Sequence, residues 1–141
     1  MIILAIDPGR DKCGYAVLNK LKSGSSFDNE ENNWVCEKGI TVTPNLRSYL
    51  EELLNKYNIG VFVLGDGTNS EKIKDLLLDN FELPVIIVNE AYTTYEAEKL
   101  YRREKLKGWK RIFSFIKWKP SKPIDDYAAV ILGQRFLKEN N

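Results

Sequence analysis

The sequence predicts an α/β fold: a five-stranded mixed sheet with the strand order 3-2-1-4-5, flanked by helices. Three strand-like segments joined by short connections come first, and they predict an antiparallel meander. Two more strand-like segments then alternate with helix-like ones. This alternation predicts right-handed crossovers to parallel strands, with the fourth strand beside the first. The length of 141 residues fits a single domain over residues 1–141.

Each strand is expected where aliphatic residues gather between turn residues. The apolar run at residues 2–7 is continuous, which is typical of a buried strand. Residues 22–33 are polar and rich in Ser, Asn and Glu, so they are expected to form an exposed loop within the meander. The five expected strands cover residues 2–7, 14–19, 34–42, 60–65 and 85–88.

The helices are indicated by start signals followed by apolar faces. Pro44 suits a first helical position, and Leu46, Leu50 and Leu53 follow it on one face. A last helix is expected from about residue 123 to residue 137. Capping-box spacing marks two further helix starts, at Thr68 with Glu71 and at Thr93 with Glu96.

Acidic residues stand where three expected strands end and where the last helix begins. Asp7 closes the first strand, Asp66 closes the fourth, and Glu90 follows the fifth. Asp125 and Asp126 open the last helix. Parallel neighbours lie about 4.8 Å apart, so Asp7 and Asp66 are expected to face one site, with Glu90 one strand further out. Such a cluster repels itself unless it holds a cation.

Positive charge is concentrated in one segment. The chain has 21 basic and 20 acidic residues, yet ten basic residues and one acid lie between Lys99 and Lys122. This asymmetry predicts an anionic partner, and basic residues interleaved with aromatic ones favour nucleic acid, through phosphate contacts and base stacking. The alternatives are a solvated basic helix with its aromatic residues in the core and, more weakly, a membrane-surface helix. The expected nucleic-acid contacts are Arg102, Arg103, Lys105, Lys107, Trp109, Lys110, Arg111 and Trp118.

Several classes of protein are excluded by composition. The chain has no histidine, which rules out Ser-His-Asp and Cys-His catalysis and imidazole metal ligands. Cys13 and Cys36 lack metal-ligand spacing and are interpreted as thiols of a cytoplasmic protein. Asp7 interrupts the first apolar run before it reaches signal-peptide length, and no segment approaches transmembrane length.

Motifs spread over nearly the whole chain resemble one superfamily. Ile6-Asp7-Pro8-Gly9, followed by Gly14-Tyr15-Ala16-Val17, resembles the first motif of RuvC-type Holliday junction resolvases. The C-terminal half is more similar to the YqgF family, resolvases also linked to pre-ribosomal RNA processing: it has Asn89-Glu90 before Thr93-Thr94-Tyr95-Glu96-Ala97, and Asp125 before Ala128-Ala129-Val130-Ile131-Leu132. By order and spacing, the chain is identified as a member of the ribonuclease H-like superfamily, which implies that fold.

The resemblance implies an endonuclease that hydrolyses phosphodiester bonds in branched DNA junctions or precursor ribosomal RNA. Its cofactors would be Mg²⁺ or Mn²⁺, used as two ions about 4 Å apart. Two symmetric cuts in a junction would need a homodimer. The implied catalytic residues are Asp7, Asp66, Glu90, Asp125 and Asp126, of which all but Asp126 are expected metal ligands.

The third ligand beside Asp7 and Asp125 stays open between Asp66, in the RuvC manner, and Glu90, in the YqgF manner. Strand order ranks Asp66 nearer the metals. The alternatives to a ligand role are a turn residue for Asp66 and a favourable helix-terminal charge for Glu90 and Asp125. A non-catalytic nucleic-acid-binding module that keeps the fold is the alternative function. The Asp-Pro-Gly turn is also similar to the phosphate loop of actin-type ATPases, but those are two-lobed and far longer.

Overall fold

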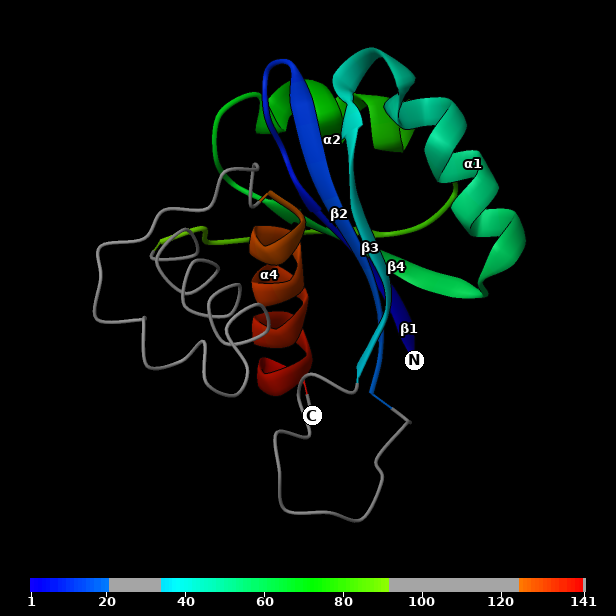
Figure 1. Ribbon diagram of the computed structural model, residues 1–141, viewed down its shortest axis with the longest axis vertical. Coiled ribbons are helices and arrows are strands. Elements are labelled where there is room, and N and C mark those ends of the chain that lie inside the picture. The colour runs from blue at the N-terminus through cyan, green and yellow to red at the C-terminus, as the bar shows by residue number, and fades with distance from the viewer. Residues whose placement is uncertain (21–33, 92–124, 141) are drawn as a thin grey trace, which may run out of the picture.

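A single mixed sheet organises the protein (Figure 1). The computed structural model describes residues 1–20, 34–91 and 125–140. Its strand order, β3-β2-β1-β4-β5, is the predicted one, so the predicted α/β fold class is confirmed. The strands are β1 (Ile2–Asp7), β2 (Lys12–Asn19), β3 (Val35–Val42), β4 (Ile59–Gly65) and β5 (Val85–Val88).

Strand pairing sets which residues meet at the edge of the sheet. β1 and β3 both pair antiparallel with β2, whereas β4 lies parallel to β1 and to β5. Asp7 lies opposite Gly14 of β2, and Ile6 lies opposite Leu64 of β4. One step further along the parallel pair, Asp7 therefore adjoins Gly65, where β4 ends.

Three described helices flank the sheet: α1 (Leu46–Lys56), α2 (Ser70–Asn80) and α4 (Asp125–Glu139). A 3₁₀ turn, η2 (Thr43–Asn45), contains Pro44, so the α-helix begins two residues later than Pro44 suggests. None of the helices within the described ranges is long and apolar enough to cross a membrane. The predicted loop at 22–33, the helix expected at Thr93 and the basic stretch lie outside the described residues.

The predicted capping box at Thr68 is wrong. α2 begins at Ser70, and within residues 34–91 no side chain caps its first turn. The residue before it, Asn69, has a left-handed backbone with φ 71°, a conformation that Asn tolerates better than most residues. Its Nδ2 donates to the Gly9 carbonyl at 3.0 Å. A tie to the β1–β2 turn thus takes the place of the local cap.

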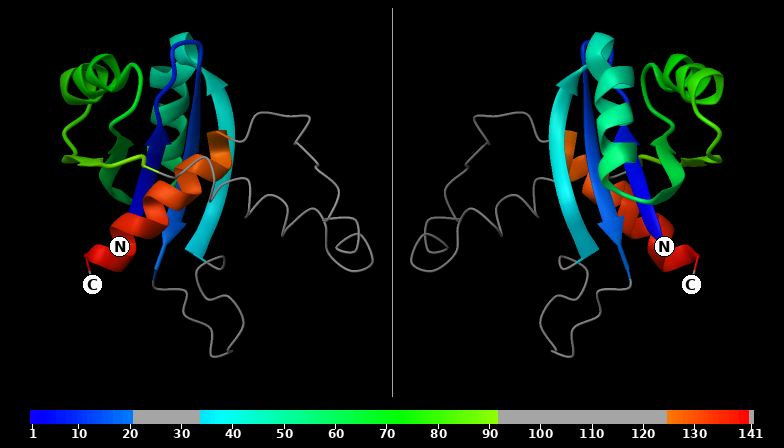
Figure 2. Two further views of the ribbon diagram at one scale, coloured as in Figure 1. Left: turned by 90° about the vertical axis from the view of Figure 1, so that its left-hand side faces the viewer. Right: turned by 90° about the vertical axis from the view of Figure 1, so that its right-hand side faces the viewer.

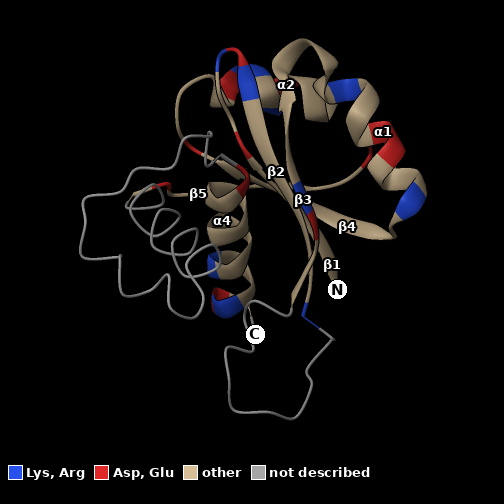
Figure 3. Cartoon of the chain, in the orientation of Figure 1, with Lys and Arg blue, Asp and Glu red and all other residues tan. Residues whose placement is uncertain are grey.

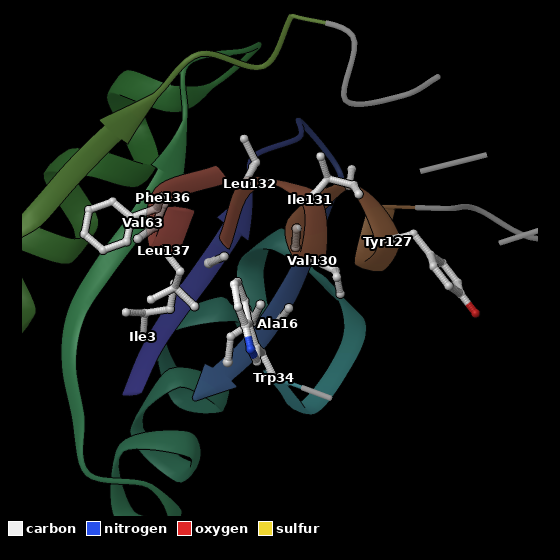
Figure 4. Packing of buried hydrophobic residues seen from close by; sticks show 14 of the residues in the cluster. Ile3, Ala16, Trp34, Val63, Tyr127, Val130, Ile131, Leu132, Phe136 and Leu137 are labelled. Atoms are coloured by element: carbon white, nitrogen blue, oxygen red, sulfur yellow. The ribbon is translucent and has the colours of Figure 1, made fainter. Parts of the chain in front are cut away.

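Helices cover both faces of the sheet (Figure 2). Residues at alternate positions of β1 point to opposite faces, so Ile3 and Ala5 pack against α4, while Leu4 and Ile6 pack against α1 and α2. Figure 4 shows the α4 side, where Leu132, Phe136 and Leu137 lie over the strands. A Cβ at Gly133 would crowd Leu18 and Ala5, so this glycine lets α4 approach the sheet closely.

Two neighbouring leucines of α2 test this packing. Leu77 is fully buried under the sheet, whereas Leu78 is 52% exposed. Leu77→Ala should lower the free energy of unfolding by about 2–5 kcal/mol, because it leaves a cavity. Leu78→Ala has the same change in chemistry and should stay within about 0.5 kcal/mol of the unaltered protein in urea unfolding. Equal losses in the two variants would contradict the orientation of α2.

Candidate functional site

Acidic residues stand at or just after the ends of β1, β4 and β5 and at the start of α4 (Figure 3). Asp7 is the last residue of β1 and is half-buried. Ile3 and Ala5 face α4, so strand alternation directs Asp7 to that same face. The first of the predicted site residues is therefore where the sequence placed it, at the end of a buried strand and beside the end of β4.

The Glu90 carboxylate folds back over the end of β4. A Cβ added at Gly65 would overlap Glu90 Oε1, and a Cβ at Gly67 would overlap Oε2. The two glycines thus form a cradle for the carboxylate, and Oε1 is buried in it. Val61 and Val63 pack toward α4, so the missing side chain of Gly65 would point to that face as well. The cradle brings Glu90 to the strand position that adjoins Asp7.

Asp66 has a different role from Glu90, because it forms hydrogen bonds with the backbone of the segment that follows β5. It is exposed, and its backbone N–H donates to the Val88 carbonyl at 3.1 Å. Its Oδ1 accepts the backbone N–H of Glu90 at 2.9 Å. These two bonds extend the β4–β5 pairing beyond the ends of both strands. Asp66 therefore fixes the backbone from which the Glu90 side chain turns back.

The segment that carries Glu90 is held from a second side by α4. Arg135 Nη1 donates to the Asn89 carbonyl at 2.9 Å, and Asn89 Oδ1 accepts the Ala91 N–H at 2.7 Å. Arg135, Gly65 and Gly67 contribute to the site although they are not among the residues that the sequence predicts. The Gly-Asp-Gly sequence does indicate a turn. It does not indicate that a distant side chain, that of Glu90, fills the space beside the two glycines.

Asp126 is engaged in contacts within the fold. Its Oδ2 lies 3.0 Å from Lys38 Nζ of β3, and its Oδ1 accepts the Tyr127 N–H at 3.0 Å. The same Lys38 Nζ lies 4.0 Å from the centre of the Tyr127 ring. Asp125 precedes Asp126 at the first position of α4. The backbone thus brings the start of α4 over β3, while the Asp125 side chain lies outside what is described.

The donors fit a hard divalent cation by their chemistry. Every candidate is a carboxylate, which Mg²⁺ and Mn²⁺ prefer, and the glycine cradle turns one of them toward the end of β1. Among the side chains that the structure describes, no three acidic or cysteine groups gather closely enough to hold an ion by themselves. The predicted set of Asp7, Asp66, Glu90 and Asp125 therefore stays a prediction, as does the role of Asp126.

A hollow of about 670 Å³ lies beside this edge of the sheet. Arg10 from the β1–β2 turn and Lys72 from α2 give it positive charge, and Glu71 adds one acid. Gly67 belongs both to this hollow and to the Glu90 cradle, so the two adjoin. The predicted nucleic-acid contacts between Arg102 and Trp118 lie outside the described residues.

The sheet order 3-2-1-4-5, the parallel crossovers and the carboxylates at the strand ends define a domain of the ribonuclease H-like class. This class includes many nucleases. The chain belongs to the Holliday junction resolvase family RuvX, whose sequence model it matches over residues 1–139. Membership confirms the predicted resemblance and the expectation of a nuclease.

Solved structures with low sequence identity share the fold. Thermus thermophilus RuvC has a TM-score of 0.60 at 14% identity, covering 99% of this chain and 97% of RuvC. A fowlpox virus resolvase bound to Holliday junction DNA has a TM-score of 0.54 at 18% identity, covering 97% of this chain and 99% of the resolvase. RuvC in complex with a Holliday junction substrate gives 0.56 at 13% identity, covering 100% and 97%. No curated protein matches the chain.

The glycine cradle yields a test that separates the site from the fold. Gly65→Ala should displace the Glu90 carboxylate, which is the tip of a flexible side chain, and so leave the melting temperature nearly unchanged. Nuclease activity should fall about 100-fold, because a carboxylate moved by an ångström no longer meets its partners.

Gly60 of the same strand is the matched control. A Cβ there would lie 3.8 Å from the Ile2 carbonyl oxygen, an ordinary contact, so Gly60→Ala should keep full activity. Thermal melts and cleavage rates of both variants make the comparison. If Gly65→Ala cleaves as fast as Gly60→Ala, the position of Glu90 is irrelevant to the reaction.

Proposed function

We propose that this protein is an endonuclease that depends on a divalent cation and cuts branched DNA of the Holliday junction type. The observation that carries the proposal is the Glu90 carboxylate, folded over Gly65 at the position beside Asp7. Carboxylates that converge on one position supply the oxygen ligands that a hard divalent cation prefers. A member of a resolvase family has a use for that cation in phosphodiester hydrolysis.

The chain supplies three donors for Mg²⁺ or Mn²⁺ in this proposal: Asp7 from β1, Glu90 from the loop after β5, and Asp125 from the start of α4. Bound divalent ions activate water and stabilise the leaving oxygen. Asp66 acts on the site through the backbone of Glu90, with which its Oδ1 is hydrogen-bonded. The rigid sheet holds Asp7, so the donors need little reorganisation when the substrate arrives.

The substrate is expected to lie along positive charge next to these donors. Within the described residues, Arg10 and Lys72 line the hollow that adjoins Gly67, and both suit phosphate contacts. The basic stretch with Arg102, Arg103, Lys110 and Arg111 would extend this surface. DNA junctions are favoured over precursor ribosomal RNA, because the RuvC and fowlpox resolvase structures of the same fold hold Holliday junction DNA. Two symmetric cuts would need a homodimer.

Asp7→Asn tests the nuclease directly. The change keeps the shape of the side chain but removes the charge, so cleavage of a four-way DNA junction should fall by about a thousandfold or more. Binding of the junction, measured by gel mobility shift with Ca²⁺ present, should persist. Excess EDTA should stop the unaltered enzyme in the same assay. Junction binding without metal-dependent cleavage by the unaltered protein would instead identify a non-catalytic binding module.

The roles of Glu90 and Asp66 are separable by substitution. Strand order alone ranked Asp66 nearer the metals, but the cradle favours Glu90. Glu90→Gln should therefore lower the cleavage rate far more than Asp66→Asn, whose amide oxygen still accepts the Glu90 N–H. Asp66→Ala removes that acceptor and should fall between the two.

Single-turnover cleavage rates at saturating Mn²⁺ give the ranking. Should Asp66→Asn be the more damaged variant, Asp66 is the third ligand and the site is built in the RuvC manner.

A further inference from the structure

β3 carries two adjacent charged residues that point to opposite faces of the sheet. Glu37 faces α1, where its Oε2 accepts from Lys56 Nζ at 2.7 Å and from Tyr57 Oη at 2.9 Å. Lys38 faces α4 and pairs with Asp126 at 3.0 Å. One strand therefore holds a helix on each side by an ion pair. Only the Lys38 pair lies on the face that carries Asp7 and the Glu90 carboxylate.

Lys38 lies on the side of the sheet that leads to the acidic edge, the end of the sheet that carries Asp7 and the Glu90 carboxylate. It is opposite Ala16 of β2, which in turn lies opposite Ala5 of β1. Asp7, two residues beyond Ala5, stands in the next row on the same face. Lys38 therefore lies on the same face as Asp7, two strands away from it and one side-chain row further from the carboxyl end of β1.

Both carboxylate oxygens of Asp126 are engaged at the start of α4, one by Lys38 and one by a backbone N–H. Asp126 Oδ2 meets Lys38 Nζ, while Oδ1 accepts the N–H of the next residue, Tyr127. The Asp126 and Lys38 side chains are only 14% and 28% exposed. The buried Tyr127 ring lies against the ammonium group, which adds a cation–π contact. Partial burial makes this pair more costly to break than an exposed one, because loss of one partner leaves the other charge partly buried and unpaired.

Asp125 and Asp126 are neighbours at a helix start, so either carboxylate could compete for a cation at this edge. The Lys38 pair removes Asp126 from that competition and fixes the first turn of α4. We propose that Lys38 is a positioning residue of the metal site: it ties Asp126 into the fold and fixes the first turn of α4, which begins at Asp125. This inference rests on the proposed metal-dependent nuclease and assigns Asp126 a supporting role through Lys38.

The test compares two ion pairs of β3. Lys38→Met breaks the pair with α4, and Lys56→Met breaks the matched pair with α1 on the opposite face. Two quantities are measured for each variant: Mn²⁺ binding to the protein without DNA, by electron paramagnetic resonance titration, and the Mn²⁺ concentration at half-maximal junction cleavage. The melting temperature is recorded as the measure of a purely structural effect.

Lys38→Met should raise both Mn²⁺ midpoints about tenfold, because the first turn of α4 is no longer fixed and the loss of outer-shell support has effects of this order. Lys38→Arg should restore them, because a guanidinium can keep the pair. Asp126→Asn weakens the same pair and should shift both midpoints in the same direction by less. Lys56→Met breaks a more exposed pair, so it should leave both Mn²⁺ midpoints unchanged and lower the melting temperature only slightly.

The inference is overturned if Lys38→Met lowers the melting temperature while its Mn²⁺ midpoints match those of Lys56→Met. Should Lys38→Met not fold, Asp126→Asn decides by the same comparison. Failure of the proposed function looks different: the unaltered protein itself would then neither bind Mn²⁺ nor cleave the junction.

Discussion

The parallel pairing of β1 with β4 is the constraint on which the site depends. Its register, with Ile6 opposite Leu64, decides that Asp7 ends beside Gly65. A slip of one residue would turn Asp7 to the opposite face, because side chains alternate along a strand. The buried residues of both strands enforce this register from two sides, since each face packs against helices. Core packing thus sets the geometry of the acidic edge.

The sequence predicted the parts of the fold that follow from hydrophobic patterning. The continuous apolar run of β1, the alternation of later strands with helices and the right-handed crossover rule are sufficient for the sheet order. Local signals at helix starts were less reliable. Thr68 and Glu71 have capping-box spacing, but a long-range bond from Asn69 to Gly9 determines where α2 begins. A hydrogen bond between residues 60 positions apart cannot be predicted from the spacing of neighbouring residues.

The candidate site could be predicted as a set of acidic residues at strand ends, but their individual roles could not. Which of Asp66 and Glu90 turns inward depends on side-chain direction after the strand has ended, and strand periodicity no longer applies there. The space that receives Glu90 is made by two glycines. Lys38 was not identified either, because its partner Asp126 lies 88 positions away. Residues that orient acidic groups are found only when the packing of α4 on the sheet is known.

The Gly9 carbonyl oxygen links the turn after β1 to the starts of two helices. It accepts from Asn69 Nδ2 before α2 and from Thr43 Oγ1 before α1. A Cβ at Gly9 would overlap the Lys12 carbonyl oxygen, so the turn that presents this acceptor needs glycine. The starts of two helices, which belong to separate crossovers, are therefore hydrogen-bonded to the same carbonyl oxygen, two residues after Asp7. The turn thus couples both helix starts to the end of β1, so a displacement of either start would also displace the residues next to Asp7.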